Sequence, residues 1–121
     1  MTLKLCVAQL NFIVGDLEGN AQKIITAARD AYADGARLLL TPELSICGYA
    51  AEDLFLRPAF IHACDDAVKS VAQALAGLKD MSVVVGHPSG GDSRTRSVAV
   101  QNRFNAASVL REGQVVATYA K

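Results

Sequence analysis

Three short apolar runs, separated by two segments of helical periodicity, place the strongest constraint on how this chain can fold. The runs lie at residues 3–10, 36–42 and 81–88, and the second contains three consecutive leucines, Leu38 to Leu40. The leucine run is typical of a strand buried on both faces of a sheet, whereas the first run alternates apolar and polar residues as a strand does. Because a helix-length segment joins each pair of runs, the three strands are expected to run parallel through helical crossovers.

Two amphipathic segments, residues 20–36 and 59–78, are expected to form these crossovers. Apolar side chains recur in both at the i, i+3 and i+4 spacing of a helix that buries one face. Asp16 or Asn20 is expected to cap the first helix, and Gly35 to end it. Pro58 is typical of a first helical turn, and Gly77 is expected to end the second helix.

A hairpin is expected after the third run. Residues 105–110 and 114–119 both suit strands, and "REGQ" between them is a turn signal. The element order is then β-α-β-α-β-β-β. This order predicts an α/β fold with a partly parallel sheet, to which the hairpin adds antiparallel strands.

Length and charge exclude several classes of function. The chain has 121 residues, which suits one domain. Its 12 basic and 12 acidic residues cancel without forming blocks, so neither nucleic acid nor a membrane surface is an expected partner. The apolar start is too short for a signal peptide, and no stretch has the length of a membrane span. The protein is expected to be soluble and cytoplasmic.

Ionisable residues stand at the ends of two predicted strands. Glu43 follows the run at 36–42 directly after Pro42, and Lys121 follows "VVATYA". Ligands of α/β folds bind beyond the carboxyl ends of strands, so Glu43 is a candidate general base. The alternative stays open that Glu43 and Lys121 form a structural ion pair.

The three cysteines, Cys6, Cys47 and Cys64, are scattered and form no C-x-x-C pair. Cys47 lies close after Glu43 and is a candidate nucleophile by position. No lysine or histidine stands near it in sequence to hold a thiolate, so a packed thiol is favoured. Cys6 and Cys64 fall on apolar positions of a strand and a helix. With two isolated histidines, the chain offers no metal site.

Several segments together carry a family resemblance along nearly the whole chain. They are "VAQLNFIVGDLEGNAQKI", "TPELSICGYAAEDLFLRPAF", "VVVGHP" and "FNAASVLREGQVVATYAK". With "PE" and "Y-x-K" closing two strands, the chain resembles the nitrilase (carbon–nitrogen hydrolase) superfamily. The long segment at 41–60, followed by "GHP" and "NAASVL", is similar to the N-terminal glutaminase domain of glutamine-dependent NAD+ synthetases.

The resemblance implies a fold and a set of site residues. Residues 1–121 would be the N-terminal portion of a four-layer α-β-β-α sandwich, with the remainder of the domain and any synthetase domain outside this chain. Glu43 would be the general base of a Glu-Lys-Cys triad and Lys121 its lysine. Tyr49 would lie near the glutamine pocket. The nucleophilic cysteine would lie beyond this chain, so these residues alone are expected to be inactive.

The resemblance also implies partners. Glutamine would be the substrate of this domain, and the ammonia released would convert deamido-NAD+ to NAD+ in a synthetase domain that uses ATP and magnesium. No cofactor and no metal is expected in this chain, and the full-length protein is expected to form homo-oligomers. Two alternatives remain: a stand-alone amidase or carbamoylase of the same superfamily, and a non-catalytic α/β module.

Overall fold

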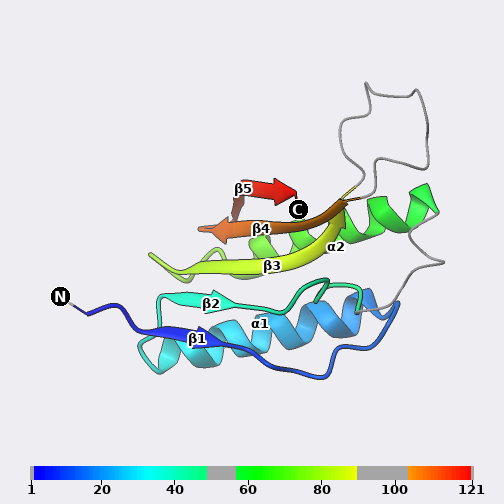
Figure 1. Ribbon diagram of the computed structural model, residues 1–121. Helices are drawn as coiled ribbons and strands as arrows, with labels where there is room; N and C mark the ends of the chain where they lie inside the picture. The colour runs from blue at the N-terminus through cyan, green and yellow to red at the C-terminus, as the bar shows by residue number, and fades with distance from the viewer. Residues whose placement is uncertain (1, 49–56, 90–103, 121) are drawn as a thin grey trace.

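The structure is a computed structural model that describes residues 2–48, 57–89 and 104–120. Within these ranges two helices and five strands follow one another in the order expected from the sequence (Figure 1). The elements are β1 (Leu5–Val7), α1 (Leu17–Ala33), β2 (Leu38–Leu40), α2 (Pro58–Ala74), β3 (Ser82–Ser89), β4 (Phe104–Arg111) and β5 (Gln114–Ala120).

The five strands form one mixed sheet in the order β1-β2-β3-β4-β5. The first three run parallel, with Leu39 between Cys6 of β1 and Val83 of β3. The β3–β4 and β4–β5 pairs are antiparallel. The α/β fold class and the partly parallel sheet predicted from the sequence are therefore confirmed.

Helix α1 begins earlier than its apolar pattern indicates. It was expected from Asn20, but the Asp16 side chain accepts a hydrogen bond from the Gly19 amide at 3.0 Å and caps a helix that begins at Leu17. This cap satisfies one of the amides that the first helical turn leaves unpaired. Asn20 is therefore not the cap, and its side chain is fully buried.

Helix α2 begins at Pro58, as predicted, and ends at Ala74, three residues before the predicted stop at Gly77. Both helices lie on the same face of the sheet (Figure 1). Their buried side chains and the strand residues that face them form one core cluster. Its fully buried members include Ile24, Leu39, Val71, Val83 and Val85.

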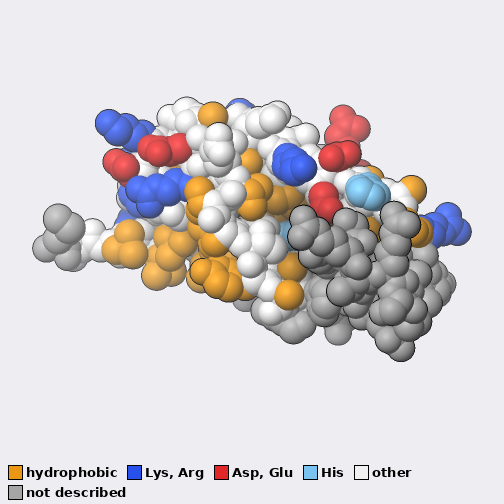
Figure 2. Space-filling model, turned by 90° about the horizontal axis from the view of Figure 1, so that it is seen from above, with side chains coloured by type: hydrophobic (Ala, Val, Ile, Leu, Met, Phe, Trp, Pro, Cys, Tyr) orange, Lys and Arg blue, Asp and Glu red, His pale blue; other side chains and the backbone are white. Residues whose placement is uncertain are grey.

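The opposite face of the sheet is open in this chain. The sequence predicted Leu38–Leu40 to be buried on both faces, and this is wrong for the chain as it stands. Leu39 is buried against the helices, whereas Leu38 and Leu40 point the other way and are half-buried. Leu5, Val7 and Tyr119 are more than half exposed, and hydrophobic side chains gather along the lower left of the view in Figure 2. Both helices occupy one face, so neither of the described helices covers the other.

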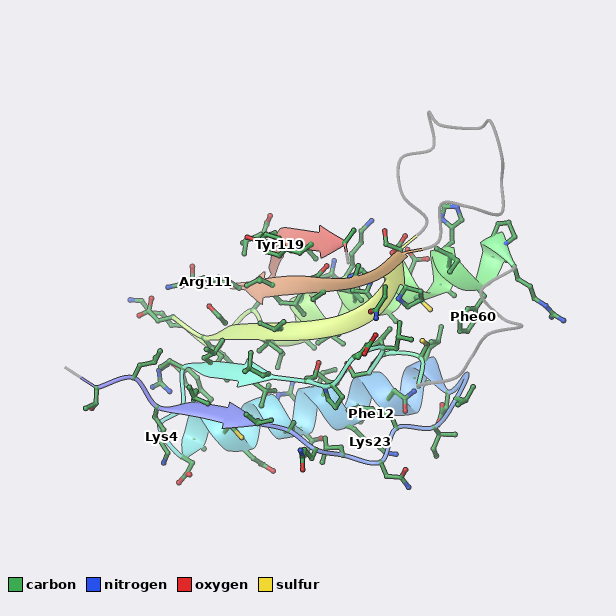
Figure 3. The ribbon with its side chains drawn as sticks, in the orientation of Figure 1. Lys4, Phe12, Lys23, Phe60, Arg111 and Tyr119 are labelled. Carbon is green, nitrogen blue, oxygen red and sulfur yellow. The ribbon has the colours of Figure 1, made fainter. Side chains whose placement is uncertain are left out.

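The hairpin predicted at "REGQ" is confirmed. Its two central residues, Glu112 and Gly113, have φ values of 50° and 86°, and positive φ at both positions is the signature of the tight turn that suits the twist of paired strands. In Figure 3 Arg111 marks the end of β4 before the turn, and Tyr119 lies near the end of β5. The turn brings the end of β5 alongside the start of β4.

Candidate functional site

Glu43 lies where the sequence placed it, just beyond the carboxyl end of β2. Thr41 and Pro42 separate it from the strand, and it opens a turn that extends to Cys47. The Glu43 side chain is exposed, whereas the residues from Leu44 to Gly48 are buried. The carboxylate therefore projects from a buried turn.

Hydrogen bonds to β3 hold this turn in place. The Thr41 hydroxyl and amide both donate to the Val84 carbonyl, at 2.7 and 3.1 Å. The Ile46 amide donates to the Gly86 carbonyl at 3.1 Å. The Thr41 and Ser45 hydroxyls also contact each other at 2.8 Å. These bonds hold both ends of the turn on one strand, on either side of Glu43.

Gly86 lets the turn approach β3 so closely. A Cβ at this position would lie 2.5 Å from the Pro42 carbonyl oxygen and 2.6 Å from the Leu44 amide nitrogen. Carbon atoms do not approach backbone atoms at such distances, so any side chain would push the turn away. The glycine of "GHP" is thus required because any side chain at this position would clash with the turn.

Leu44, the residue after Glu43, adopts a left-handed backbone conformation with φ of 54°. This conformation is uncommon for residues other than glycine, asparagine and aspartate. Its side chain is buried in the core, which offsets the backbone strain. Strained residues cluster at functional sites, where the surroundings enforce a fixed geometry.

Asn20 clamps the far end of the turn. Its side-chain amide donates to the Ile46 carbonyl at 3.1 Å and to the Ile13 carbonyl at 2.7 Å, while its oxygen accepts from the Ile13 amide at 2.8 Å. The Gly15 amide also donates to the Cys47 carbonyl at 2.9 Å. The loop after β1, the helix α1 and the turn are therefore one connected unit.

Asn105, the second residue of β4, contacts Glu43 directly. Its side-chain amide donates a hydrogen bond to Oε1 of Glu43 across 62 positions of the sequence. Sequence reasoning missed this residue as part of the site. It noted "NAASVL" only as a family segment, and the polar side chain of Asn105 near the start of this strand was the local signal.

The three cysteines are packed thiols, as the sequence favoured. Cys47 and Cys64 are fully buried, and Cys6 is half-buried. The Cys47 thiol lies 3.5 Å from the Gly48 carbonyl and 3.7 Å from the Leu44 carbonyl. A hydrogen bond between the two buried thiols lowers the pKa of Cys47 and raises the pKa of Cys64. The Cys47 side chain is thus directed into the core and away from the exposed side of the turn.

Tyr49 and Lys121 lie outside the described residues. The neighbour of Lys121 in the chain, Ala120, ends β5 and pairs with Ala106 of β4. Ala106 is in turn next to Asn105, which contacts Glu43. The end of β5 therefore lies beside the part of β4 that carries Asn105.

His87 belongs to a separate polar network on the helix face of the sheet. It is 4% exposed, and its Nε2 lies 2.6 Å from the Ser108 hydroxyl, which lies 2.8 Å from the Thr118 hydroxyl. Nδ1 lies 3.1 Å from the Pro88 carbonyl, which can only accept. A neutral ring therefore carries its hydrogen on Nδ1 and accepts from Ser108 at Nε2. Both ring nitrogens of His87 are thus held by hydrogen bonds.

No three side chains among the His, Cys, Asp and Glu of the described residues converge to hold a metal ion. No helix that the structure describes is long and apolar enough to cross a membrane.

A groove of about 910 Å³ lies between β1 and α1, and none of the residues that line it belongs to the turn at Glu43. Lys23 crosses one end of this groove and donates to the Asn11 carbonyl beside Phe12 (Figure 3). The groove is mostly apolar and is separate from the candidate site.

Comparison with known families gives a match over almost the whole chain. Residues 4–121 match the model of the carbon–nitrogen hydrolases. The chain belongs to the carbon–nitrogen hydrolase family. The resemblance inferred from the sequence is thus confirmed for the family, and the matched range includes Glu43, Asn105 and Lys121.

Relatives of this chain include glutamine-dependent NAD(+) synthetases. The one from Xanthomonas campestris pv. campestris (strain 8004) is 42% identical over 123 residues, which cover 99% of this chain and 20% of the relative. The one from Aquifex aeolicus (strain VF5) is 36% identical over 98% of this chain and 19% of the relative. The chain therefore spans about a fifth of the length of these relatives.

Solved structures extend the likeness to the fold. A glutamine-dependent NAD(+) synthetase from Cytophaga hutchinsonii has a TM-score of 0.83 and 26% identity, covering 100% of this chain and 19% of that one. An amidase from Nesterenkonia sp. has a TM-score of 0.74 at 23% identity, covering 98% of this chain and 42% of that one. At that identity the amidase supports only the fold, which is that of the N-terminal part of nitrilase-type proteins.

Proposed function

We propose that residues 1–121 are the N-terminal portion of the glutaminase domain of a glutamine-dependent NAD+ synthetase. The observation that carries this proposal is the mount of Glu43: an exposed carboxylate on a buried, hydrogen-bonded turn at the end of a parallel strand. Full-length similarity of the chain to several such synthetases supports the same assignment.

In this proposal Glu43 is the general base of glutamine hydrolysis. It removes the proton from a cysteine thiol supplied by a part of the protein outside these residues, and the thiolate attacks the side-chain amide carbon of glutamine. Lys121 and backbone amides stabilise the negative oxygen of the tetrahedral intermediate. Glu43 passes that proton to the leaving nitrogen, which departs as ammonia. The carboxylate, now ionised again, activates a water molecule that cleaves the thioester to give glutamate and the free thiol.

The remaining assignments rest on the family resemblance. Tyr49 is assigned to the glutamine pocket. The synthetase reaction, in which ATP with magnesium activates deamido-NAD+ and ammonia displaces AMP, is assigned to a separate domain. Residues 1–121 alone, without the nucleophilic cysteine, are expected to release no glutamate from glutamine.

The test is a Glu43→Gln variant of the full-length protein. Glutamine-dependent formation of NAD+ should fall at least about 1,000-fold, because an amide cannot take the thiol proton. Formation of NAD+ from added ammonium should be unchanged. Glu18→Gln, which removes an exposed carboxylate from the first turn of α1, is the matched control.

Each outcome separates the proposal from an alternative. Unchanged glutamine-dependent turnover in Glu43→Gln would mean that Glu43 has only a structural role. Hydrolysis of amides or carbamoyl compounds without any NAD+ formation from ammonium would instead assign the chain to a stand-alone amidase or carbamoylase.

A further inference from the structure

The contact between Asn105 and Glu43 joins two elements that are far apart in sequence. Asn105 is in β4, whereas Glu43 follows β2, and β3 lies between these strands in the sheet. The Asn105 amide donates to one oxygen of the carboxylate, Oε1. Neither the family match nor the sequence pattern assigns a role to this asparagine.

The strand register explains why Asn105 can reach Glu43. Ala106 and Ser108 are buried, and Ser108 contacts His87 on the helix face. Since side chains alternate along a strand, Asn105 points to the opposite, open face. The turn that carries Glu43 crosses β3 on that same face, over Gly86. In the β3–β4 ladder Asn105 lies opposite Pro88, and Ala107 lies opposite Gly86. Asn105 is therefore two positions along the ladder from the residue that the turn crosses.

Asn105 lies in a strand that is paired along its whole length, whereas the Glu43 side chain is exposed on a turn. The β3–β4 ladder pairs eight residues on each strand, from Ser82–Arg111 to Ser89–Phe104. Glu43 is exposed, and an exposed glutamate samples several rotamers whose loss costs up to about 2 kcal/mol. A hydrogen bond from a fixed strand restricts this freedom.

The chemistry of the donor matters as much as its position. A neutral amide orients the carboxylate without forming an ion pair that would compete with its role as a base. Because Oε1 accepts the amide hydrogen, Oε2 remains available to take a proton. We propose that Asn105 is a positioning residue that holds the carboxylate of Glu43 in the orientation for proton transfer. This inference rests on the proposed function, in which Glu43 is the general base.

Asn105→Ala in the full-length protein tests the role in catalysis. Loss of the contact should lower kcat for glutamine hydrolysis by about 10- to 100-fold, since small misplacements of catalytic groups have effects of this size. KM for glutamine should change less than about 3-fold, because Asn105 does not contact the substrate in this proposal. NAD+ formation from ammonium should not change. Asn11→Ala, an exposed asparagine far from β4 in sequence, is the control.

Asn105→Asp provides a readout that a merely structural role would not change. The aspartate has the same shape, so folding should be preserved, but its charge repels Glu43 at neutral pH. The neighbouring Glu43 carboxylate disfavours ionisation of this aspartate, so at acidic pH the protonated aspartate can again donate to Glu43. The ratio of variant to wild-type kcat should therefore rise at least about 5-fold as pH is lowered from 7.5 to 5.

The outcomes distinguish this inference from the proposed function. If Glu43→Gln is inactive while Asn105→Ala keeps wild-type kcat, the positioning role is wrong and the general base stands. A ratio for Asn105→Asp that stays constant across pH also overturns the positioning role. If Glu43→Gln keeps full activity, both proposals fall together.

Discussion

The Pro42 carbonyl oxygen lies only 2.5 Å from where a Cβ of Gly86 would be. The turn that carries Glu43 thus packs against a glycine, which is the only residue type without a Cβ. This contact joins the end of β2 to the middle of β3 on the open face of the sheet. It makes the identity of residue 86 decisive for the position of Glu43.

Gly86→Ala is therefore expected to displace the turn. The added methyl group would meet backbone atoms of Pro42 and Leu44, which cannot rotate away as a flexible side chain could. We expect the free energy of unfolding to fall by about 1–3 kcal/mol, measured by urea denaturation. Glutamine-dependent activity of the full-length variant should fall more than its folded fraction.

Gly77→Ala is the matched control, because nothing lies within 4 Å of a Cβ at that position. Its free energy of unfolding should stay within about 0.5 kcal/mol of the wild type. Equal effects of the two substitutions would show that the close approach at Gly86 does not hold the turn.

Asn20→Ala should release the other end of the turn. The buried Asn20 side chain satisfies two groups of Ile13 and the Ile46 carbonyl, and its removal leaves these backbone groups without their partner. A loss of about 2–4 kcal/mol in the free energy of unfolding is expected. Hydrogen exchange should also quicken at the Ile13 amide, which donates to Asn20.

Gln22→Ala, on the exposed side of α1, provides the comparison for Asn20. It should change the free energy of unfolding by less than about 0.5 kcal/mol. Protection of the Ile13 amide that survives in Asn20→Ala would contradict the clamp.

The sequence predicted the location of residues that a local pattern marks, such as Glu43. It missed residues whose contacts depend on how the strands pair, such as Asn105. Glu43 was placed correctly because an apolar run followed by proline marks the end of a buried strand. Asn105 was missed because its contact spans 62 positions, and no local pattern states which residues of β4 face the end of β2. Asn20 was expected as a possible cap of α1, yet its side chain points inward and bonds to Ile13 of the loop after β1 and to Ile46 of the turn after Glu43.

The open face of the sheet shows a second limit of pattern reasoning. The leucine run correctly indicated a strand with apolar residues on both sides. It could not indicate that both crossover helices pack on the same side, since this depends on the handedness of each connection and the order of the strands. Leu38 and Leu40 thus belong to a run typical of a strand buried on both faces, yet their own side chains are only half-buried.

Ser108→Ala should destabilise the network on the helix face. His87 is nearly fully buried, and the Ser108 hydroxyl is the partner of its Nε2. An unsatisfied buried nitrogen costs about 1–3 kcal/mol, which thermal and urea unfolding would detect. Thr118→Val removes only the outer hydroxyl, leaves the His87–Ser108 bond intact and should cost less. A larger loss in Thr118→Val than in Ser108→Ala would contradict the assigned direction of the network.

Asp65, on α2 near His87, should make stability depend on pH. Desolvation by burial is the main cause that raises the pKa of its carboxyl above the usual 3.8, against smaller opposing effects of His87, His62 and Lys69. The folded state then binds this proton more tightly than the unfolded state. The contribution to stability is full below pH 3.8 and is lost as pH rises through the folded-state pKa.

Asp65→Asn should remove this dependence. At pH 7 the variant should be more stable than the wild type, by at most about 1 kcal/mol because the partly exposed carboxylate is screened by solvent. Near pH 3 the two proteins should differ little, since the wild-type carboxyl is then neutral. Urea unfolding at intervals between pH 3 and 7 measures the difference, with Asp30→Asn on the exposed face of α1 as the control for charge removal. A difference between Asp65→Asn and wild type that stays constant over this range would show that burial does not raise the pKa of Asp65.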